Sequence, residues 1–485
     1  MKKIKYLILT SLLIAIGACE NVDFGDTNVN PNGAADPNTS SLMAGAMSRY
    51  STITGRDGLL KPTLYVQYQS QVTYVDEMLY NEAAVSWYSY YVQTLSNLQL
   101  VIDINSDVEN HNTILLSQGA PENQIAVSEI FKTIIFKRIT DSWGDIPYSE
   151  ALKDKENLSP LYDSQSSIYE SMLAQLKTSR DNLDDSKLGP TGDIIFGGNV
   201  TQWKKMANSL ILQLSLQLSK KYPSASGIAA AAFNEALNDP SGVIEDISDE
   251  AWFIYNEDFQ NPYSANRKPD YFLSQEFTDA LKGIGTTSNT LLDSRINVYS
   301  DDPSKDGVPY GYANGSGAGK ASMSDYIWTE LAPLPLMTAA YTYLNRADAA
   351  NLGWTTEDAA DMLKMGVEKS YETLDAHYGT SISASATAYA TSRVADMTTY
   401  GATRVIAEEK WVTLFPNGFD AWSEWRRTDF PALVPATDFF NDGQIPRRYN
   451  YPTEENSLNK ANYDSGVAAL LPATDKNTSR VWWDQ

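Results

Sequence analysis

The sequence predicts an all-α fold in which tetratricopeptide-like helix pairs carry long irregular insertions and an irregular C-terminal part packs on the helices. Three observations support this prediction. Apolar residues recur at helical spacing in several segments, these segments follow one another in pairs, and stretches rich in Pro, Gly, Asn and Asp separate the pairs. Stacked antiparallel helix pairs are the unit of tetratricopeptide-type arrays. The consensus spacing of those arrays is not met, so we interpret the repeats as degenerate.

The chain begins with a predicted bacterial export signal. Three lysines within the first five residues precede an apolar run, residues 6–16, which is shorter than the about 20 residues that span a bilayer. A Gly-Ala pair then leads to Cys19, in the pattern of a lipidation motif. We therefore expect 1–18 to be a lipoprotein signal peptide and 19–40 to be the lipidated Cys19 with a flexible tether. The alternative is an ordinary signal peptide with a chance cysteine at its end.

Composition limits the partners and the means of stabilisation. The 485 residues carry a formal net charge of −24, whereas nucleic-acid binding needs clustered Lys and Arg, so no nucleic-acid partner is predicted. Hydrophobic residues make up 42% of the chain, which is enough for a sizeable core. Since Cys19 is the only cysteine, no internal disulfide can form, and the fold must be stabilised by packing.

The predicted helices follow in chain order as pairs. They are 41–56 with 84–106, 123–140 with 166–185, 201–220 with 227–238, and 335–351 with 356–377. Two of these helices show a clear apolar stripe. In the helix at 166–185 the stripe consists of Ile168, Met172, Leu176 and Leu183. In the helix at 201–220 it consists of Trp203, Met206, Ala207, Leu210 and Leu214.

Polar residues at the ends of these segments predict where the helices begin and end. Ser167 with Glu170, and Thr355 with Asp358, have the spacing of a capping box, in which side chains bond the free backbone N–H groups of the first turn. Gly379 can end the helix at 356–377, because glycine readily adopts the left-handed conformation of a helix C-terminus.

The insertions and the C-terminal part lack helical periodicity. Residues 240–330 are rich in Asp, Asn, Pro, Gly and aromatics, and include a Gly-rich loop at 298–320. Long loops of this kind are usually functional or disordered. From about residue 381 the chain runs through a low-complexity Ser/Ala/Thr stretch. Residues 415–485 have many Pro, Trp and Arg, and we expect them to pack as irregular structure onto the helices.

Catalytic and metal-binding patterns are scarce. The two histidines, His111 and His377, lie in a polar loop and near a predicted helix end, which argues against nucleophilic catalysis. The stretch 302–307 begins like a calcium loop, but Ala313 stands where the loop needs Glu, so a solvated turn is predicted. No metal and no cofactor are expected. A glycosidase stays open as an alternative, because it needs only two carboxylates and the chain has 61 acidic residues.

Aromatic residues are the remaining candidates for ligand binding, with 29 Tyr, 14 Phe and 11 Trp. Sugars present apolar C–H faces that stack on aromatic rings, while their hydroxyls bond polar side chains. The candidates are Tyr74, Tyr80, Trp87, Tyr310 and Tyr312. Tyr310 and Tyr312 lie in the polar Gly-rich loop and are expected to be exposed. Trp87 begins a predicted helix, and a core position is as consistent with the pattern as a ligand-facing one.

The stretch FPNGFDAWSEWRRTDFP, residues 415–431, places two tryptophans beside two arginines and several acids. This composition is typical of binding sites, but the stretch belongs to a C-terminal part that needs tight internal packing. We therefore interpret Trp422 and Trp425 as core anchors. We expect Arg426 and Arg427 to pair with nearby acids or backbone carbonyls, because a planar guanidinium makes several hydrogen bonds at once.

Seven stretches, in order, resemble the motifs of one family. They are DTNVNPN (26–32), DSWGDIPYSEAL (141–152), QWKKMANSLILQLSLQLS (202–219), NPYSANRKPDYFLSQEFTDAL (261–281), EKWVTLFPNGFDAWSEWRRTDFP (409–431), IPRRYNYPTEENSLNKANY (445–463) and VWWDQ (481–485). The chain thereby resembles the SusD/RagB-type starch-binding outer-membrane lipoproteins over essentially its whole mature length. It departs from the family in 337–354, where Tyr341 and Asp348 replace two acids of the family pattern, which puts the local salt bridges in doubt.

The resemblance implies a function. Residues 41–485 would form a single α-helical nutrient-binding domain, without catalytic activity, anchored by lipid and exposed on the cell surface. Its ligand would be an oligosaccharide, and its partner a SusC-like TonB-dependent outer-membrane transporter. Two alternatives stay open: a peptide or another nutrient as the ligand, and a pure protein-interaction scaffold. The binding aromatics of the family vary with the ligand, so no site residue is carried over from its motifs.

Overall fold

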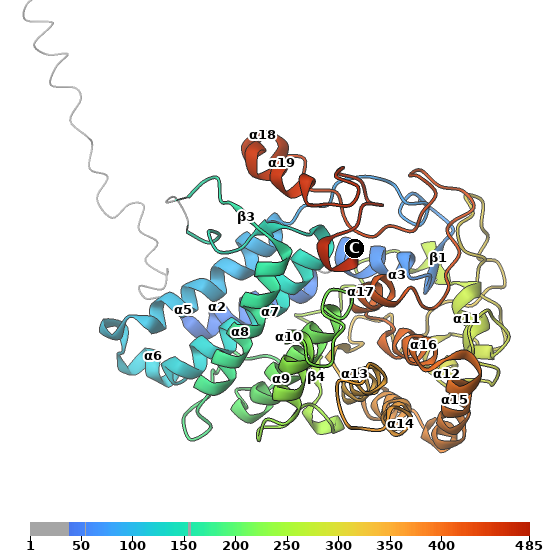
Figure 1. Ribbon diagram of the computed structural model, residues 1–485, viewed down its shortest axis with the longest axis horizontal. Coiled ribbons are helices and arrows are strands. Elements are labelled where there is room, and N and C mark those ends of the chain that lie inside the picture. The colour runs from blue at the N-terminus through green and yellow to red at the C-terminus, as the bar shows by residue number, and fades with distance from the viewer. Residues whose placement is uncertain (1–37, 54, 154–156) are drawn as a thin grey trace, which may run out of the picture. The chain divides into compact units, whose positions relative to one another are not determined.

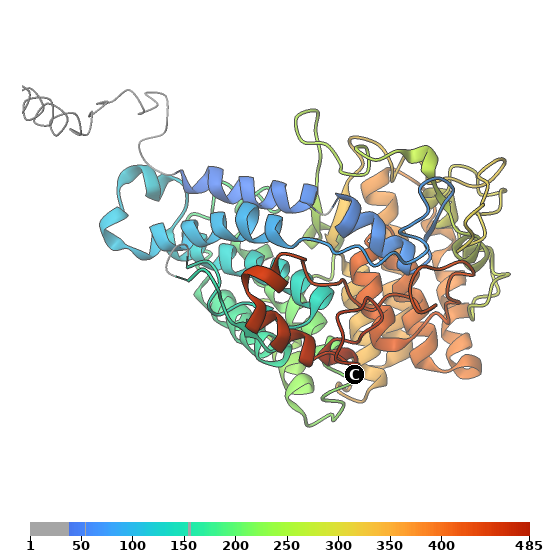
Figure 2. The ribbon, with the colours of Figure 1, turned by 90° about the horizontal axis from the view of Figure 1, so that it is seen from above.

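Apolar stripes bring the predicted helices together in pairs. The computed structural model describes residues 38–53, 55–153 and 157–485, so the predicted export signal and Cys19 lie outside the described residues. α2 (Thr39–Ile53) packs along a helix formed by α4 (Tyr88–Tyr90), η4 (Tyr91–Leu95) and α5 (Ser96–Ser106). Figure 2 shows α2 and α5 side by side. The all-α prediction is confirmed.

The other predicted pairs are also present. α7 (Pro121–Trp143) packs on α8 (Gln165–Asn182), α9 (Val200–Gln217) on α10 (Ile228–Leu237), and α13 (Ala339–Asn351) on α14 (Ala359–Tyr378). The predicted stripes are buried in α8 and α9. In Figure 1 the pairs follow one another from blue through green to orange, in chain order.

A further pair lies where the sequence showed only low complexity. α15 (Ala386–Tyr400) packs between α14 and α16 (Ala402–Leu414), at the orange end of the array in Figure 1. The buried face of α15 consists of Ala386, Tyr389, Ala390 and Arg393. Among the many Ser, Ala and Thr residues of this stretch, that face gives no clear apolar period. The interpretation of this stretch as a low-complexity insertion is therefore wrong from residue 386 on.

The C-terminal part is irregular over most of its length but begins with a helix. α17 (Gly418–Thr428) is capped by Asn417, whose side chain accepts a hydrogen bond from the backbone N–H of Asp420 at 3.2 Å. The expectation that the C-terminal part has no helix is therefore wrong for residues 418–428. Further on, the short elements α18 (Glu455–Leu458), α19 (Lys460–Ala468) and η10 (Trp482–Asp484) interrupt the irregular chain.

Short elements connect the pairs. Antiparallel two-stranded ribbons join β1 (Gln69–Gln71) to β5 (Tyr271–Leu273), β2 (Ile146–Pro147) to β3 (Tyr162–Asp163), and β4 (Ala251–Phe253) to β6 (Leu334–Met337). The remaining elements are η3 (Gly55–Leu60), α3 (Lys61–Tyr65), η5 (Val108–Asn110), α6 (Thr113–Ser117), η7 (Ile247–Asp249), η8 (Lys268–Asp270), α11 (Gln275–Lys282), α12 (Ile296–Tyr299) and η9 (Ser383–Ser385). Within the described part of the chain, no helix has the length and apolarity needed to cross a membrane.

The predicted capping boxes are displaced by three residues. α8 starts earlier than predicted and is capped by Ser164, whose side chain accepts a hydrogen bond from the backbone N–H of Ser167. The N–H of Gln165, the first residue of the helix, donates to Asp145 at 2.8 Å. α14 is capped by Asp358 itself, which accepts from the N–H groups of the first turn. The predicted end at Gly379 is confirmed, with a left-handed φ of 67°.

Trp422 and Trp425 are core anchors, as predicted. The Trp422 ring is fully buried and lies 5.3 Å from the rings of both Tyr65 and Tyr449, measured between centroids. Its indole N–H donates to the carbonyl of Pro446 at 2.8 Å. Trp425 is also buried. A buried indole costs no unsatisfied hydrogen bond when its N–H has a partner. Through these contacts of Trp422, α17 packs both on α3 and on the irregular chain near Tyr449.

The side chains at the two positions that depart from the family pattern, Tyr341 and Asp348, both have hydrogen-bond or ion-pair partners. The Tyr341 hydroxyl donates to Glu424 at 2.8 Å. Asp348 forms ion pairs with Lys410, at 2.9 Å, and with Arg427. Burial alone would raise the pKa of Asp348, but these two cations hold it at about 2. The local salt bridges are therefore kept, and Arg427 pairs with acids as predicted.

Candidate functional site

An open cleft of about 480 Å³ lies between the start of the helix at 88–106, the segment that joins β2 to β3, and α18. In Figure 1, α18 and α19 lie beside β3. The position of α18 is fixed by side chains that bond the β2–β3 segment: Asn459 and Asn462 both donate to the carbonyl of Pro160, at 2.9 and 3.0 Å. The cleft is lined by Trp87, Tyr88, Tyr91, Val92, Ser96, Pro147, Glu150, Ala151, Leu152, Lys153, Asn157, Leu158, Pro160, Glu455, Leu458 and Asn459.

The aromatic run at 86–91 divides between the core and the cleft. Trp87 is only 2% exposed, and its ring packs edge to face with Trp143 and Tyr451, at 5.6 and 5.7 Å between centroids. The next residue, Tyr88, points outward and is 38% exposed. Trp87 is therefore a core residue that forms the floor of the cleft, and Tyr88 offers the exposed ring.

A carboxylate is held beside this ring. Glu455 is buried and accepts hydrogen bonds from the hydroxyls of Tyr162, at 2.7 Å, and Tyr88, at 3.3 Å. Burial, followed by the Glu455 charge, raises the pKa of Tyr88, so its hydroxyl stays protonated near neutral pH. Glu150, which also lines the cleft, accepts from Asn157 at 2.9 Å. Each carboxyl oxygen has two lone pairs, so both acids can accept further hydrogen bonds from a ligand.

Two of the candidate tyrosines lie in the core. Tyr310 is 5% exposed, so the expectation that its loop keeps it in solvent is wrong. Gly307 and Gly311 explain the difference: a Cβ at Gly307 would lie 2.1 Å from the carbonyl oxygen of Ser274, so the loop presses against its neighbours. Tyr80 is fully buried, and its hydroxyl accepts from the N–H of Ala436 at 2.9 Å. Neither ring has a free face on which a sugar could stack.

The other two tyrosines lie in two loops outside the cleft, and these loops approach each other at Gly315, where a Cβ would lie 3.8 Å from the carbonyl oxygens of both Gln71 and Tyr312. Tyr74 is 63% exposed and Tyr312 is 43% exposed, and neither lines the cleft. The guanidinium of Arg267 lies 5.7 Å from the Tyr74 ring centre. The loop that carries Tyr312 is tied to the C-terminal chain by the N–H of Asp438, which donates to the carbonyl of Gly311 at 3.0 Å. We call the surface defined by Tyr74 and Tyr312 the loop face. Ligand binding by Tyr74 and Tyr312 stays a prediction.

The predicted solvated turn at 302–307 agrees with the contacts of its acids. Asp302 accepts from the backbone N–H of Ser304 at 3.0 Å, and Asp306 pairs with Lys282 at 2.8 Å. Among the described residues, no three His, Cys, Asp or Glu side chains are grouped so that they could hold a metal ion.

Asp145, which precedes the cleft residue Pro147, provides a pH-dependent test of this region. Its burial raises the pKa of Asp145 to about 6, whereas an unfolded Asp titrates near 3.9. Ionising it in the folded state therefore costs stability as the pH rises from about 4 to 6, and no cost remains below about 4. Asp145→Asn is expected to raise the free energy of unfolding by about 3 kcal/mol at pH 7 and by much less at pH 4, measured by urea denaturation. An equal gain at both pH values would contradict this explanation.

Comparison with known proteins identifies the family of this chain. The family model described as "Starch-binding associating with outer membrane", SusD-like_2, matches residues 31–452. The chain belongs to this SusD-like family. No curated protein matches the chain. The family assignment confirms the resemblance drawn from the motifs, and it makes the protein a member of an outer-membrane-associated family.

Solved structures, among them those of SusD homologues, have the same fold. A chitin-binding protein is 25% identical, with a TM-score of 0.78, covering 92% of this chain and all of that one. A SusD homologue from Bacteroides uniformis ATCC 8492 is 21% identical, with a TM-score of 0.75, and covers 93% of this chain and all of that one. A chitin-binding SusD homologue from Flavobacterium johnsoniae is 22% identical, with a TM-score of 0.72, and covers 92% of this chain and 97% of that one.

Proposed function

We propose that this SusD-like protein is a non-catalytic lipoprotein of the outer-membrane surface, anchored through Cys19. It binds an oligosaccharide in the cleft beside Tyr88 and delivers it to a TonB-dependent transporter. The observation that carries this proposal is an exposed tyrosine ring set next to carboxylates in a cleft of about 480 Å³. That volume lies within the about 300–1,000 Å³ of typical ligand pockets.

The chemistry of the cleft suits a sugar. The ring of Tyr88 can stack on the apolar C–H face of a pyranose, and the exposed side chains of Leu158 and Leu458 extend the apolar surface. Glu150 and Glu455 accept hydrogen bonds from hydroxyls at the edge of the ring. The chitin-binding relatives support a glycan as the ligand. The predicted export signal and the position of Cys19 support the anchor, and the family supports the transporter partner.

Calorimetric titration with chito-oligosaccharides and malto-oligosaccharides tests the proposal. Tyr88→Ala is expected to weaken binding about tenfold, because one stacked ring is lost. The melting temperature should fall only slightly, since the Tyr88 ring is partly in solvent and Glu455 keeps its shorter hydrogen bond from Tyr162. The matched control is Tyr400→Ala, which removes a tyrosine that is 41% exposed and lies outside the cleft.

Three results would redirect the proposal. Binding that survives Tyr88→Ala but is lost in the double variant Tyr74→Ala/Tyr312→Ala would move the site to the loop face. Failure of both glycan series to bind would favour a peptide or another nutrient. Release of shorter products from the added oligosaccharides would make the protein a glycosidase, with Glu150 and Glu455, which both line the cleft, as the first acids to test.

A further inference from the structure

A second cavity, of about 430 Å³, adjoins the cleft. Its walls come from α5, α7 and α8 and from the segment after β2. Ala151, Leu152 and Lys153 line both cavities, whereas Tyr148 and Ser149 line only the second. The two cavities are therefore neighbours that share one short stretch of chain. We call the second one the polar cavity.

The polar cavity is lined by both hydrogen-bond donors and hydrogen-bond acceptors. On α5, Gln99 donates to Asp103 at 2.8 Å, and the ammonium of Lys132 on α7 donates to Gln99 at 2.7 Å. Glu129 forms an ion pair with Lys132 at 3.3 Å. The two acids of the lining, Asp103 and Glu129, are balanced by its two lysines, Lys132 and Lys153, so the lining has no excess charge. Such a surface suits hydroxyl groups, which donate and accept, better than it suits an ion.

An aromatic pair lines the same cavity. The rings of Phe136 and Tyr148 pack edge to face, with 4.6 Å between centroids. Within the described part of the chain, the Tyr148 hydroxyl has no hydrogen-bond partner. Burial raises the pKa of Tyr148 to about 12, so this hydroxyl is a donor at neutral pH. A ligand in the polar cavity therefore finds a ring and a free hydroxyl together.

The wall shared by the two cavities is held in an uncommon backbone conformation. Leu152 has a φ of 64°, in the left-handed region that residues with a Cβ rarely adopt. Such conformations persist only where the surroundings impose them, and they cluster at ligand-binding sites. Here the strained residue stands between the exposed ring of Tyr88 and the polar groups of α5 and α7.

We propose that the cleft and the polar cavity together bind one neutral oligosaccharide that passes along Leu152. One sugar ring stacks on Tyr88, and the polar cavity takes the hydroxyls of a further ring. This inference rests on the proposed function and deepens it: the protein selects a neutral chain of several sugars over a single sugar.

Calorimetric titration with neutral oligosaccharides of increasing length tests this inference. The probes are the chito- and malto-oligosaccharide series, from disaccharide to hexasaccharide. Wild-type affinity is expected to rise about tenfold once the chain reaches the polar cavity. The double variant Gln99→Ala/Asp103→Ala should lose this rise while its disaccharide affinity stays within about twofold of wild type. Gln175→Trp, which fills the cavity from α8, is a second variant with the same expected result. Thr178→Ala, an exposed change on α8 outside both cavities, is the control.

The outcomes separate this inference from the proposed function. Equal wild-type affinity for short and long chains would overturn the inference and leave glycan binding in the cleft intact. An unchanged length dependence in both polar-cavity variants would do the same. Failure of every member of both series to bind would overturn the proposed function, and this inference with it.

Discussion

Arg426→Ala is expected to lower the free energy of unfolding by about 3–5 kcal/mol, a large part of the about 5–15 kcal/mol by which native proteins are stable. Arg426 is fully buried, and its guanidinium donates to the carbonyls of Asp141, at 2.5 Å, and Arg447, at 2.8 Å. It also lies 3.9 Å from the Trp422 ring and 4.8 Å from that of Trp483. The substitution opens a cavity and leaves two buried carbonyls without donors.

Urea denaturation and the yield of soluble protein measure this effect. Burial lowers the pKa of Arg426 to about 10, which still leaves the guanidinium charged at neutral pH. Lys460→Ala is the control, because it breaks an exposed ion pair with Asp464 and should change stability by less than about 0.5 kcal/mol. If Arg426→Ala instead left stability unchanged and abolished ligand binding, the stretch 415–431 would be a binding site rather than core.

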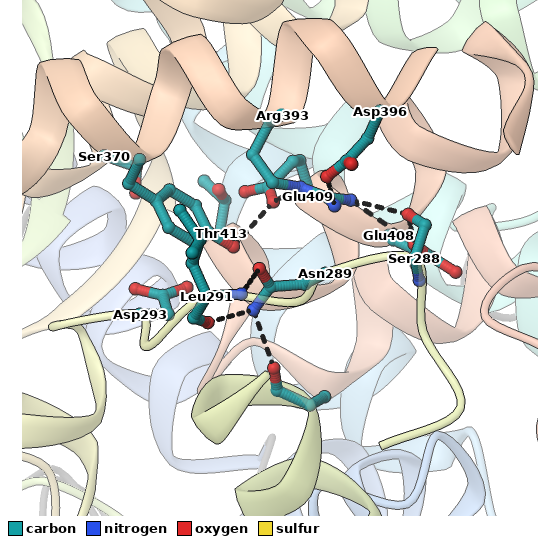
Figure 3. A network of polar contacts seen from close by, with 12 residues as sticks. Ser288, Asn289, Leu291, Asp293, Ser370, Arg393, Asp396, Glu408, Glu409 and Thr413 are labelled. Atoms are coloured by element: carbon teal, nitrogen blue, oxygen red, sulfur yellow. Dashed lines mark hydrogen bonds and ion pairs between the residues drawn. The ribbon is translucent and has the colours of Figure 1, made fainter. Parts of the chain in front are cut away.

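Glu409→Gln is expected to cost a similar amount, about 3–5 kcal/mol, because it removes the shared partner of two buried guanidinium groups. Glu409 accepts from Arg295, at 2.7 Å, from Arg393, at 2.6 Å, and from the hydroxyl of Tyr389, at 2.9 Å. Figure 3 shows Arg393 reaching Glu409 from α15, with Asp396 and Ser288 around it. This network holds the last helix pair to the rest of the array.

The same carboxylate predicts the response to acid. Burial alone would raise the pKa of Glu409, but Arg295 and then Arg393 overcome that effect and hold it below its ordinary value. The stability that Glu409 contributes is therefore fully present above the unfolded pKa, about 4.3, and is lost as the pH falls through the lower folded pKa. Urea denaturation should show a smaller deficit of Glu409→Gln under strongly acidic conditions than at pH 7. Glu372→Gln, which breaks an exposed ion pair with Lys369, should show almost no deficit at either pH.

The parts of the fold that the sequence predicted are those with a strong apolar period. Trp203, Met206 and Leu210 mark α9 without help from the rest of the chain, because their spacing alone defines a buried face. α15 was missed because its buried face includes alanines and Arg393, whose burial depends on a partner at Glu409. α17 was missed because its buried face includes charged residues such as Arg426 beside Trp422. A search for apolar periodicity does not count a buried arginine as part of the core.

The candidate site was predictable only in part. The aromatic run at 86–91 lies where the cleft is found, but the helix that begins there turns Trp87 inward and Tyr88 outward. Glu455 could not be found, because its hydrogen bonds to Tyr88 and Tyr162 join residues that are 367 and 293 positions apart in the sequence. Tyr310 was misplaced because the close packing of its glycine-rich loop depends on neighbours distant in sequence.

The most direct test of the central claim is a crystal structure of the protein with an oligosaccharide that binds it. We expect one pyranose ring stacked on Tyr88, with a hydroxyl within hydrogen-bonding distance of the Glu455 or Glu150 carboxylate. A sugar bound at Tyr74 and Tyr312 on the loop face, with the cleft beside Tyr88 empty, would contradict it.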